Sequence, residues 1–393
     1  MLMAPSEKNV WKKLPLKSHV NQANENKNDY KLAFRGKKII QMVGSEKLPV
    51  LARLLENPNY IDINNFYQRR LSWDKQAQSR LIESFLYNFP VPSITLYEKG
   101  HKSYIVIDGK QRILAIKDFY DNKLQLTGLE LNPELNGLTY NQIPENFKEN
   151  INRRPIDTVV LLTDNTFNAE EVSQQNRTIF ERLNRTSIGE LLTNQEFRSY
   201  VYYGKLNDLL IDLASSSIFA SSWEIPIDEP EKLATNKLHQ NLEDAELILY
   251  FFALRHLQGY QGKLRDFLDI YMFRSMNFKN EDIQFLKEIF IKTINLAYDI
   301  YKEKLFKPFD AKLNNWAEKA EKAYYTAVMV GLSRHLHSLD ILVERKLRLV
   351  EETKKMFEKD EFVLFTDNTD TTTEILQRKI ELFDNMLSKV IAG

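Results

Sequence analysis

The sequence predicts an α+β protein, with a small mixed sheet and helices in the N-terminal half and an all-α C-terminal half. Short β-branched and aromatic runs at residues 93–97, 104–107 and 156–162 are typical of strands. Long stretches with apolar residues at helical spacing fill residues 206–391. Only 12 glycines and 12 prolines occur among 393 residues, so few turns and long helices are expected.

The composition excludes several classes of site. Lys and Arg total 54 and Asp and Glu total 54, so a DNA contact must come from a local patch and not from a global basic field. The absence of cysteine excludes disulfides, thiolate catalysis and Cys-based zinc sites. No run of 18 apolar residues occurs, and residues 1–28 lack the apolar core of a signal peptide, so we expect a cytoplasmic protein without a membrane segment.

Three segments are predicted along the chain. Residues 1–45 are polar at first, without sustained periodicity, and are expected to form a flexible arm. Residues 46–200 carry the strand patterns and are expected to form the site-bearing domain. Residues 201–393 are expected to form a helical domain.

The elements of the N-terminal half follow from local patterns. Residues 74–89 carry an apolar stripe at helical spacing and end at Pro90, and Thr193 with Glu196 has the form of a capping box. Further helices are expected at residues 48–55, 139–150 and from about 168 to 184, and a further strand at 124–131.

The C-terminal half contains no convincing strand pattern. Amphipathic helices are expected at residues 206–218, 242–257, 264–273, 283–301, 311–335, 338–357 and 371–391.

The joint between the strand at 104–107 and the helix that follows is the leading site candidate. A strand that turns through Gly109 into a helix directs backbone N–H groups and the positive end of the helix dipole at one spot, which attracts phosphate. Lys110 and Arg112 would add cationic donors in the first helical turn. The alternative is Asp108 as a simple N-cap beside two solvated basic residues.

A second candidate is the segment at residues 61–73, which is dense in arginine and aromatic residues. Guanidinium groups such as that of Arg69 bind oxyanions bidentately, and the Trp73 ring can stack on a base. The alternative is Trp73 as a core anchor, with Arg69 and Arg70 in solvent.

Three stretches in order carry a family resemblance. They are residues 67–73 (Tyr-Gln-Arg-Arg-Leu-Ser-Trp), 106–112 (Val-Ile-Asp-Gly-Lys-Gln-Arg), and 180–184 (Phe-Glu-Arg-Leu-Asn) with 196–198 (Glu-Phe-Arg). Together they resemble the N-terminal domain of GmrSD-type modification-dependent restriction endonucleases, a ParB/sulfiredoxin-like family of bacterial anti-phage systems. The resemblance covers roughly residues 61–271.

The resemblance implies a ParB-like nucleotide-binding core, NTP hydrolysis with Mg²⁺, and coupling to the nicking of DNA, including modified DNA. It does not indicate which NTP is used. The residues that match the family pattern are Gln68, Arg69, Trp73, Asp108, Gly109, Gln111, Arg112, Phe180, Asn184 and Glu196.

This chain departs from the family pattern at several positions. Lys110 replaces a glutamine, Ala115 stands where threonine is frequent, and Leu71 stands where an aromatic residue is usual. Many relatives also carry a C-terminal His-Asn-His nuclease domain, whereas no such cluster occurs here. DNA cleavage by this chain alone is therefore not expected.

The residue roles divide between binding and catalysis. Backbone N–H groups at Gly109, with Lys110 and Arg112, are expected to hold phosphates, and Arg69 to add charge from a facing loop that also contains Gln68 and Trp73. The catalytic set would be Asp108, which holds Mg²⁺ or positions water, Gln111, which orients the attacking water, and Arg112; Asn184 would contact substrate or metal.

Three functions remain open at this point. The first is a defence NTPase that acts on DNA. The second is a non-catalytic DNA or nucleotide sensor that recruits a separately encoded nuclease or defence subunit. The third is a helical interaction protein in which the motif has decayed.

Overall fold

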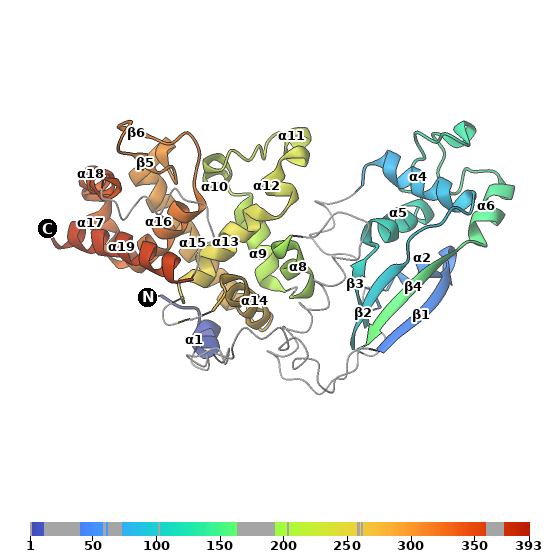
Figure 1. The fold of residues 1–393 in the computed structure, drawn as a ribbon, viewed down its shortest axis with the longest axis horizontal. Coiled ribbons are helices and arrows are strands. Elements are labelled where there is room, and N and C mark those ends of the chain that lie inside the picture. The colour runs from blue at the N-terminus through green and yellow to red at the C-terminus, as the bar shows by residue number, and fades with distance from the viewer. Residues whose placement is uncertain are drawn as a thin grey trace, which may run out of the picture. The chain divides into compact units, whose positions relative to one another are not determined.

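The computed structural model in Figure 1 describes residues 2–11, 40–57, 60–61, 73–100, 103–162, 193–202, 204–257, 260, 262–358 and 373–393. The chain divides into two compact units. We call Asn24–Leu192 the sheet unit, and Met1–Ala23 together with Thr193–Gly393 the helical unit. The architecture is α+β, with a small mixed sheet and a helical C-terminal half, as predicted.

The sheet has the strand order β1-β4-β2-β3, from β1 (Ile40–Lys47), β2 (Ile94–Gly100), β3 (Ser103–Asp108) and β4 (Pro155–Leu162). Strand β4 runs parallel to β2, whereas the β1–β4 and β2–β3 pairs are antiparallel. The predicted strands at 93–97, 104–107 and 156–162 are confirmed as β2, β3 and β4. Strand β1 was not predicted, because it falls inside the range assigned to a flexible arm and leaves most of its residues exposed.

Helices α2 (Leu48–Leu54), α4 (Lys75–Leu86), α5 (Lys110–Tyr120) and α6 (Glu145–Asn152) complete the sheet unit. Helix α5 contacts β2, α2 contacts β1, and the four helices pack on one another. Alternate residues are buried in β2, at Ile94 and Leu96, and in the first half of β4, at Ile156 and Thr158, as expected for a sheet covered on one face. The core contains Leu48, Leu51, Ile82, Phe85, Ile94, Leu96, Val106, Ile113, Ile116, Phe119, Ile151 and Ile156.

Helix α4 begins where the sequence predicts. The Asp74 carboxylate accepts a hydrogen bond from the Ala77 backbone N–H at 2.7 Å, which is the usual N-cap arrangement. Its C-terminal end is followed by Asn88 in the left-handed region at φ 57° and then by Pro90. The helix therefore fixes the segment that leads into β2.

The predicted strand at residues 124–131 is wrong. Leu124 and Leu126 are buried, but the segment pairs only locally, through Leu126 with Leu138 and Gly137, before it turns at Gly128. The backbone N–H groups of residues 130–132 bind the Glu83 carboxylate instead of a strand. An apolar run can be buried without a ladder when a side chain supplies the hydrogen bonds.

The helical unit is built mainly from helices in its described residues. The predicted helices at 242–257, 264–273, 283–301 and 371–391 are confirmed, whereas those at 206–218 and 338–357 are each divided into two helices and the one at 311–335 begins late. Helix α1 (Pro5–Trp11) belongs to this unit although it lies in the range predicted as an arm. The others are α8 (Asn194–Val201), α9 (Lys205–Ala214), α10 (Ser217–Ser222), α11 (Pro230–Thr235), α12 (Lys237–Gln240), α13 (Glu243–Leu254), α14 (Leu264–Ser275), α15 (Asn280–Tyr301), α16 (Lys322–Arg334), α17 (Leu339–Glu344), α18 (Lys346–Phe357) and α19 (Thr373–Ala392).

The predicted helix at 311–335 begins only at Lys322. A two-residue hairpin of β5 (Phe309–Asp310) and β6 (Asn315–Trp316) precedes it. The Asp310 carboxylate accepts from the backbone N–H groups of Lys312 and Leu313 at 2.8 and 3.1 Å, and so closes the turn. These side-chain bonds compete with the helix at its expected start.

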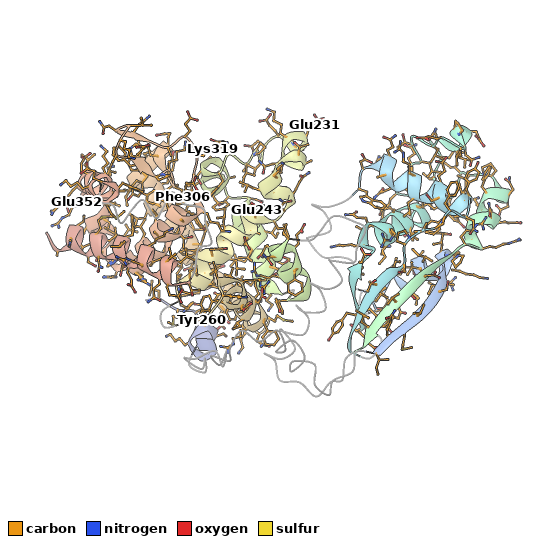
Figure 2. The ribbon with its side chains drawn as sticks, in the orientation of Figure 1. Glu231, Glu243, Tyr260, Phe306, Lys319 and Glu352 are labelled. Carbon is orange, nitrogen blue, oxygen red and sulfur yellow. The ribbon has the colours of Figure 1, made fainter. Side chains whose placement is uncertain are left out.

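Figure 2 draws the described side chains. Phe306 is fully buried inside the helical unit, whereas Glu231 and Lys319 are exposed at its surface. Among the described residues, no helix combines the length and the apolar character needed to cross a bilayer.

Candidate functional site

The joint between β3 and α5 depends on a glycine. Gly109 has φ +91° and is the N-cap residue of α5. A Cβ atom at this position would lie 3.0 Å from Cγ1 of Ile94 and 3.1 Å from Nη2 of Arg112. A side chain is therefore excluded by both the backbone conformation and the close approach of its neighbours.

The alternative in which Asp108 is a simple N-cap is wrong. The N-cap residue of α5 is Gly109, which has no side chain to cap the helix. Asp108 is the last residue of β3, and its carboxylate points instead to Arg112. The Asp108 carboxylate therefore does not cap the N-terminal end of the helix, whose partial positive charge favours an anion.

Asp108 and Arg112 form an ion pair one helical turn apart. Nη2 of Arg112 donates to Oδ2 of Asp108 at 3.0 Å and to the Ser93 carbonyl at 3.1 Å. The Asp108 side chain is 40% exposed and that of Arg112 14%. Nε of Arg112 is buried and has no hydrogen-bond partner among the described residues. The guanidinium is therefore fixed in place while part of its donor capacity is unused.

Gln111 is engaged with a second motif. Its side-chain oxygen accepts a hydrogen bond from the Trp73 backbone N–H at 2.9 Å. This bond ties the end of the arginine-rich segment to α5. The Trp73 side chain is 37% exposed, so the alternative in which it anchors the core is wrong.

The remaining predicted residues of this site divide into two groups. Lys110 is half-buried at the first position of α5. Ala115 is fully buried in the core, so a hydroxyl at this position would not face the joint. Gln68, Arg69, Arg70, Leu71, Phe180 and Asn184 lie outside the described residues.

The predicted Mg²⁺ ligand, Asp108, stands without a cluster around it. In the described part of the chain, no group of three or more His, Cys, Asp or Glu side chains is placed to hold a metal ion. Mg²⁺ commonly keeps several waters and binds through one or two carboxylates together with substrate phosphates. The half-exposed Asp108 carboxylate fits that mode of binding, in which most ligands come from nucleotide and water.

The last motif lies on α8, in the helical unit. The Thr193 hydroxyl accepts from the Glu196 backbone N–H at 3.2 Å, and the Glu196 carboxylate accepts from the Thr193 backbone N–H. The predicted capping box is confirmed. Glu196 thus has a structural role in starting the helix.

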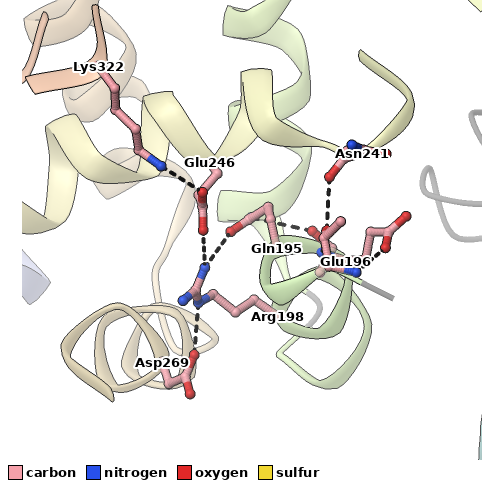
Figure 3. Close-up of polar contacts among 9 residues, drawn as sticks. Gln195, Glu196, Arg198, Asn241, Glu246, Asp269 and Lys322 are labelled. Carbon is pink, nitrogen blue, oxygen red and sulfur yellow. Dashed lines mark hydrogen bonds and ion pairs between the residues drawn. The ribbon is translucent and has the colours of Figure 1, made fainter. Parts of the chain in front are cut away.

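Arg198, two residues further, lies in a buried ionic cluster (Figure 3). Its Nε donates to Asp269 and its Nη1 to Glu246, each at 2.8 Å, and its side chain is 1% exposed. Glu246 also pairs with Lys322 at 3.0 Å. Burial acts to lower the pKa of Arg198, but Asp269 and Glu246 outweigh it and raise the pKa above its ordinary value.

We call Arg198, Glu246, Asp269 and Lys322 the α8 clamp. Burial tends to raise the pKa of Glu246, but Lys322 and Arg198 together hold that pKa below its usual value. Two cations thus face two carboxylates, and the cluster is balanced in charge. Sequence reasoning missed Glu246, Asp269 and Lys322, and the only available signal was a charged residue inside an apolar helical stretch, as at Asp269.

The chain was compared with known proteins on this basis. No curated protein and no solved structure matches it. One family model, described as the N-terminal domain of the GmrSD restriction endonuclease, matches residues 51–202. This match spans the Asp108–Arg112 joint and ends on α8 just after Arg198. Residues 51–202 are therefore similar to the GmrSD N-terminal domain, the family that the three sequence motifs resemble.

Proposed function

We propose that this protein is a restriction-type defence protein whose sheet unit binds and hydrolyses a nucleoside triphosphate and acts on or senses DNA. The GmrSD N-terminal domain supports the restriction-type assignment. The observation that supports nucleotide binding is the uncapped, glycine-dependent joint with Arg112 fixed beside it. The four-stranded mixed sheet is compatible with a ParB/sulfiredoxin-like core.

In this proposal the phosphates lie at the N-terminus of α5. Backbone N–H groups and the helix dipole favour an anion there, and the unused Nε of Arg112 adds a charged donor. A phosphate oxygen would compete with the Asp108 carboxylate for Nη2 of Arg112. The carboxylate released in this way becomes available to a phosphate-bound metal ion or to a water molecule.

Hydrolysis would proceed by attack of water on the terminal phosphorus. The bond to the bridging oxygen breaks, and the products are inorganic phosphate and the nucleoside diphosphate. When bound, Mg²⁺ supplies charge neutralisation on the phosphate oxygens. Asp108 is the residue of this chain best placed to accept the proton of the water, because its carboxylate is half-exposed beside the proposed phosphate position.

The distribution of charge favours the sheet unit as the DNA-binding part. The sheet unit, Asn24–Leu192, contains 23 Lys and Arg against 21 Asp and Glu, whereas the helical unit contains 31 against 33. The basic excess supports a local DNA contact in the N-terminal half. DNA in plain or modified form is therefore the proposed partner.

One observation favours a second function. The Gln111 side-chain oxygen accepts from the Trp73 N–H, so part of its hydrogen-bonding capacity holds the Trp73 backbone instead of orienting an attacking water as predicted. A protein that binds nucleotide without hydrolysis would then act as a sensor that recruits a separately encoded nuclease. Binding without turnover is the property that separates the two functions.

The test is NTP hydrolysis by the purified protein with Mg²⁺, in the presence and absence of plain or modified DNA. Asp108→Asn and Arg112→Ala are compared with Lys117→Ala, whose ion pair with Asp121 has the same i,i+4 spacing at the other end of α5. We expect turnover that the first two substitutions abolish and the control retains. Equal turnover in all variants would contradict the assigned site. Nucleotide binding without turnover would support the sensor function.

A further inference from the structure

The N-terminal segment, which we define as residues 2–8, is held on the helical unit by polar contacts. Ala4 and Glu7 are fully buried, although the segment belongs to a region with little apolar pattern. Helix α1 packs against α15 and is drawn beside α14 in Figure 1. The buried Glu7 requires explanation, because an isolated buried carboxylate is costly.

The helical unit surrounds the Glu7 carboxylate with donors. Oε1 accepts from Nε2 of His256 at 2.9 Å and from the Tyr271 hydroxyl at 2.8 Å, and Oε2 accepts from the Ala4 N–H at 2.8 Å. Arg255 lies 3.9 Å from Oε2 and donates to the Leu2 carbonyl. Burial tends to raise the pKa of Glu7, but His256 and Arg255 keep that pKa below its usual value. The carboxylate is therefore bound as an anion.

A second anchor lies at Ser6. Its backbone N–H and its hydroxyl donate to the two oxygens of Asp282 at 2.8 and 2.6 Å. Asp282 also accepts from the Lys279 N–H and so caps the first turn of α15. The acceptor is thus fixed by its own helix, whether or not Ser6 is bound.

The receptor groups belong to helices that lie far from the N-terminal segment in the sequence. Arg255 and His256 directly follow α13, Tyr271 lies within α14, and Asp282 lies in the first turn of α15. Nη1 of Arg255 is buried and has no hydrogen-bond partner in the described part of the chain. This guanidinium is therefore only partly satisfied by the segment that occupies the site.

Within residues 2–8, the contacts with the helical unit contain little apolar area. Leu2 is 50% exposed, Met3 is half-buried, and the buried Ala4 has a small side chain. In contrast, α8 buries Phe197 completely beside the Arg198 ion pairs. Segments with few apolar contacts open at low free-energy cost, so docking of residues 2–8 can be reversed without unfolding of the unit.

We propose that the helical unit carries a peptide-binding site, formed by Arg255, His256, Tyr271 and Asp282, whose occupant is the N-terminal segment of the same chain. The site recognises a carboxylate at position 7, a hydroxyl and N–H at position 6, and a carbonyl at position 2. Release of the segment opens a carboxylate receptor beside the C-terminal end of α13, helix α14 and the first turn of α15.

The test uses full-length protein. Glu7→Ala empties the site, and a fluorescent peptide of residues 1–11 is then titrated into this variant and into the wild type. We expect the peptide to bind the variant at least about tenfold more tightly than the wild type, whose site is already filled. A peptide with Glu7→Gln should bind more weakly than the natural peptide.

Hydrogen exchange gives a second readout that does not depend on peptide binding. The amides of residues 2–8 should exchange faster in Glu7→Ala and in the milder Ser6→Ala, but not in Lys8→Ala, whose side chain is exposed. Unchanged protection in Glu7→Ala, or equal peptide affinity for variant and wild type, would overturn the proposal. Dimer formation through exchanged segments would overturn the same-chain occupant. None of these measurements depends on nucleotide or DNA.

Discussion

Two ion clusters in this molecule contain residues of the sequence motifs that resemble one family. They differ in how much of the hydrogen-bonding capacity of their charged groups is left unused. At the β3–α5 joint, Arg112 is fixed by Asp108 and Ser93, but the carboxylate is half-exposed and Nε of Arg112 is unused. In the α8 clamp, Arg198 is buried and bonded to two carboxylates. Position in a family motif therefore does not by itself indicate contact with a ligand.

Burial explains why the clamp is structural. Exchange of a partner in a fully buried pair exposes an uncompensated charge to a low-dielectric interior, which is strongly unfavourable. At the half-exposed joint, water and a phosphate can replace the Asp108 carboxylate at smaller cost. The joint can thus rearrange around a ligand, whereas the clamp holds α8 on α13 and α14.

The largest expected effect is that of Arg198→Met. This substitution leaves Glu246 and Asp269 buried without their partner, and we expect the helical unit to lose about 3–5 kcal/mol of unfolding free energy. Urea denaturation followed by circular dichroism measures the loss, with the exposed Arg348→Met as control. A loss below about 1 kcal/mol, as for a surface residue, would show that the two clusters do not differ.

Arg112→Ala should have the opposite profile. We expect nucleotide affinity to fall at least about tenfold, since a charge-assisted hydrogen bond is removed, while the free energy of unfolding changes by no more than about 1 kcal/mol. Isothermal titration with the triphosphate measures the affinity, and the same denaturation assay measures the free energy of unfolding. If nucleotide affinity were retained and the free energy of unfolding fell strongly, Arg112 would be a structural residue like Arg198.

Gly109→Ala tests the backbone of the joint. The left-handed conformation costs about 1–2 kcal/mol for a residue with a Cβ, and contact with Ile94 adds to this. We expect a destabilised sheet unit and weaker nucleotide binding. Gly137→Ala, at φ +87° but with open space around the added Cβ, separates the conformational cost from the steric one. Equal losses of unfolding free energy in both variants would show that the close approach of Ile94 adds no cost.

The smallest expected effect is the pH dependence of N-terminal docking. Burial lowers the pKa of His256 below 6.5, and the pKa of Glu7 lies below 4.5 because His256 and Arg255 outweigh burial. A group whose folded pKa is lowered loses its stabilising contribution as the pH falls. Docking should therefore weaken as the pH falls below about 4.5, where Glu7 begins to take up a proton, whereas a proton on His256 strengthens its bond to the Glu7 carboxylate.

The other groups at this site either do not change this pH range or also weaken docking within it. Arg255 stays charged, and Tyr271 stays neutral because burial raises its pKa. Hydrogen bonds from Ser6 hold the pKa of Asp282 low against the effect of burial, so its protonation also weakens docking at acid pH. Peptide binding to Glu7→Ala protein, measured from pH 4 to 8, checks the trend. Constant affinity across this range would contradict it.

Strong local signals made much of the fold predictable. The β-branched run at 156–162, the apolar stripe at 74–89 and the Thr193 capping box each specify an element through nearby residues. Strand β1 gave no such signal, because an exposed edge strand shows little hydrophobic alternation. The hairpin at 309–316 depends on Asp310 bonds that compete with the expected helix.

The candidate site was predictable in its position but only partly in its contacts. The turn at Gly109 follows from a strand and a helix with one glycine between them. The pairing of Arg112 with Asp108 and of Gln111 with Trp73 depends on tertiary geometry that spacing does not encode. The partners of Arg198 are 48 and 71 residues away in the sequence, so no local pattern could indicate them.

The most direct test of the central contrast is hydrogen exchange of the wild-type protein with and without Mg²⁺ and each nucleoside triphosphate. The account predicts that nucleotide slows exchange of the amides at residues 108–113, where the first turn of α5 would bind phosphate, and leaves residues 194–201 unchanged. Protection on α8 without protection at the joint would contradict it, because the buried clamp and not the half-exposed pair would then respond to the ligand.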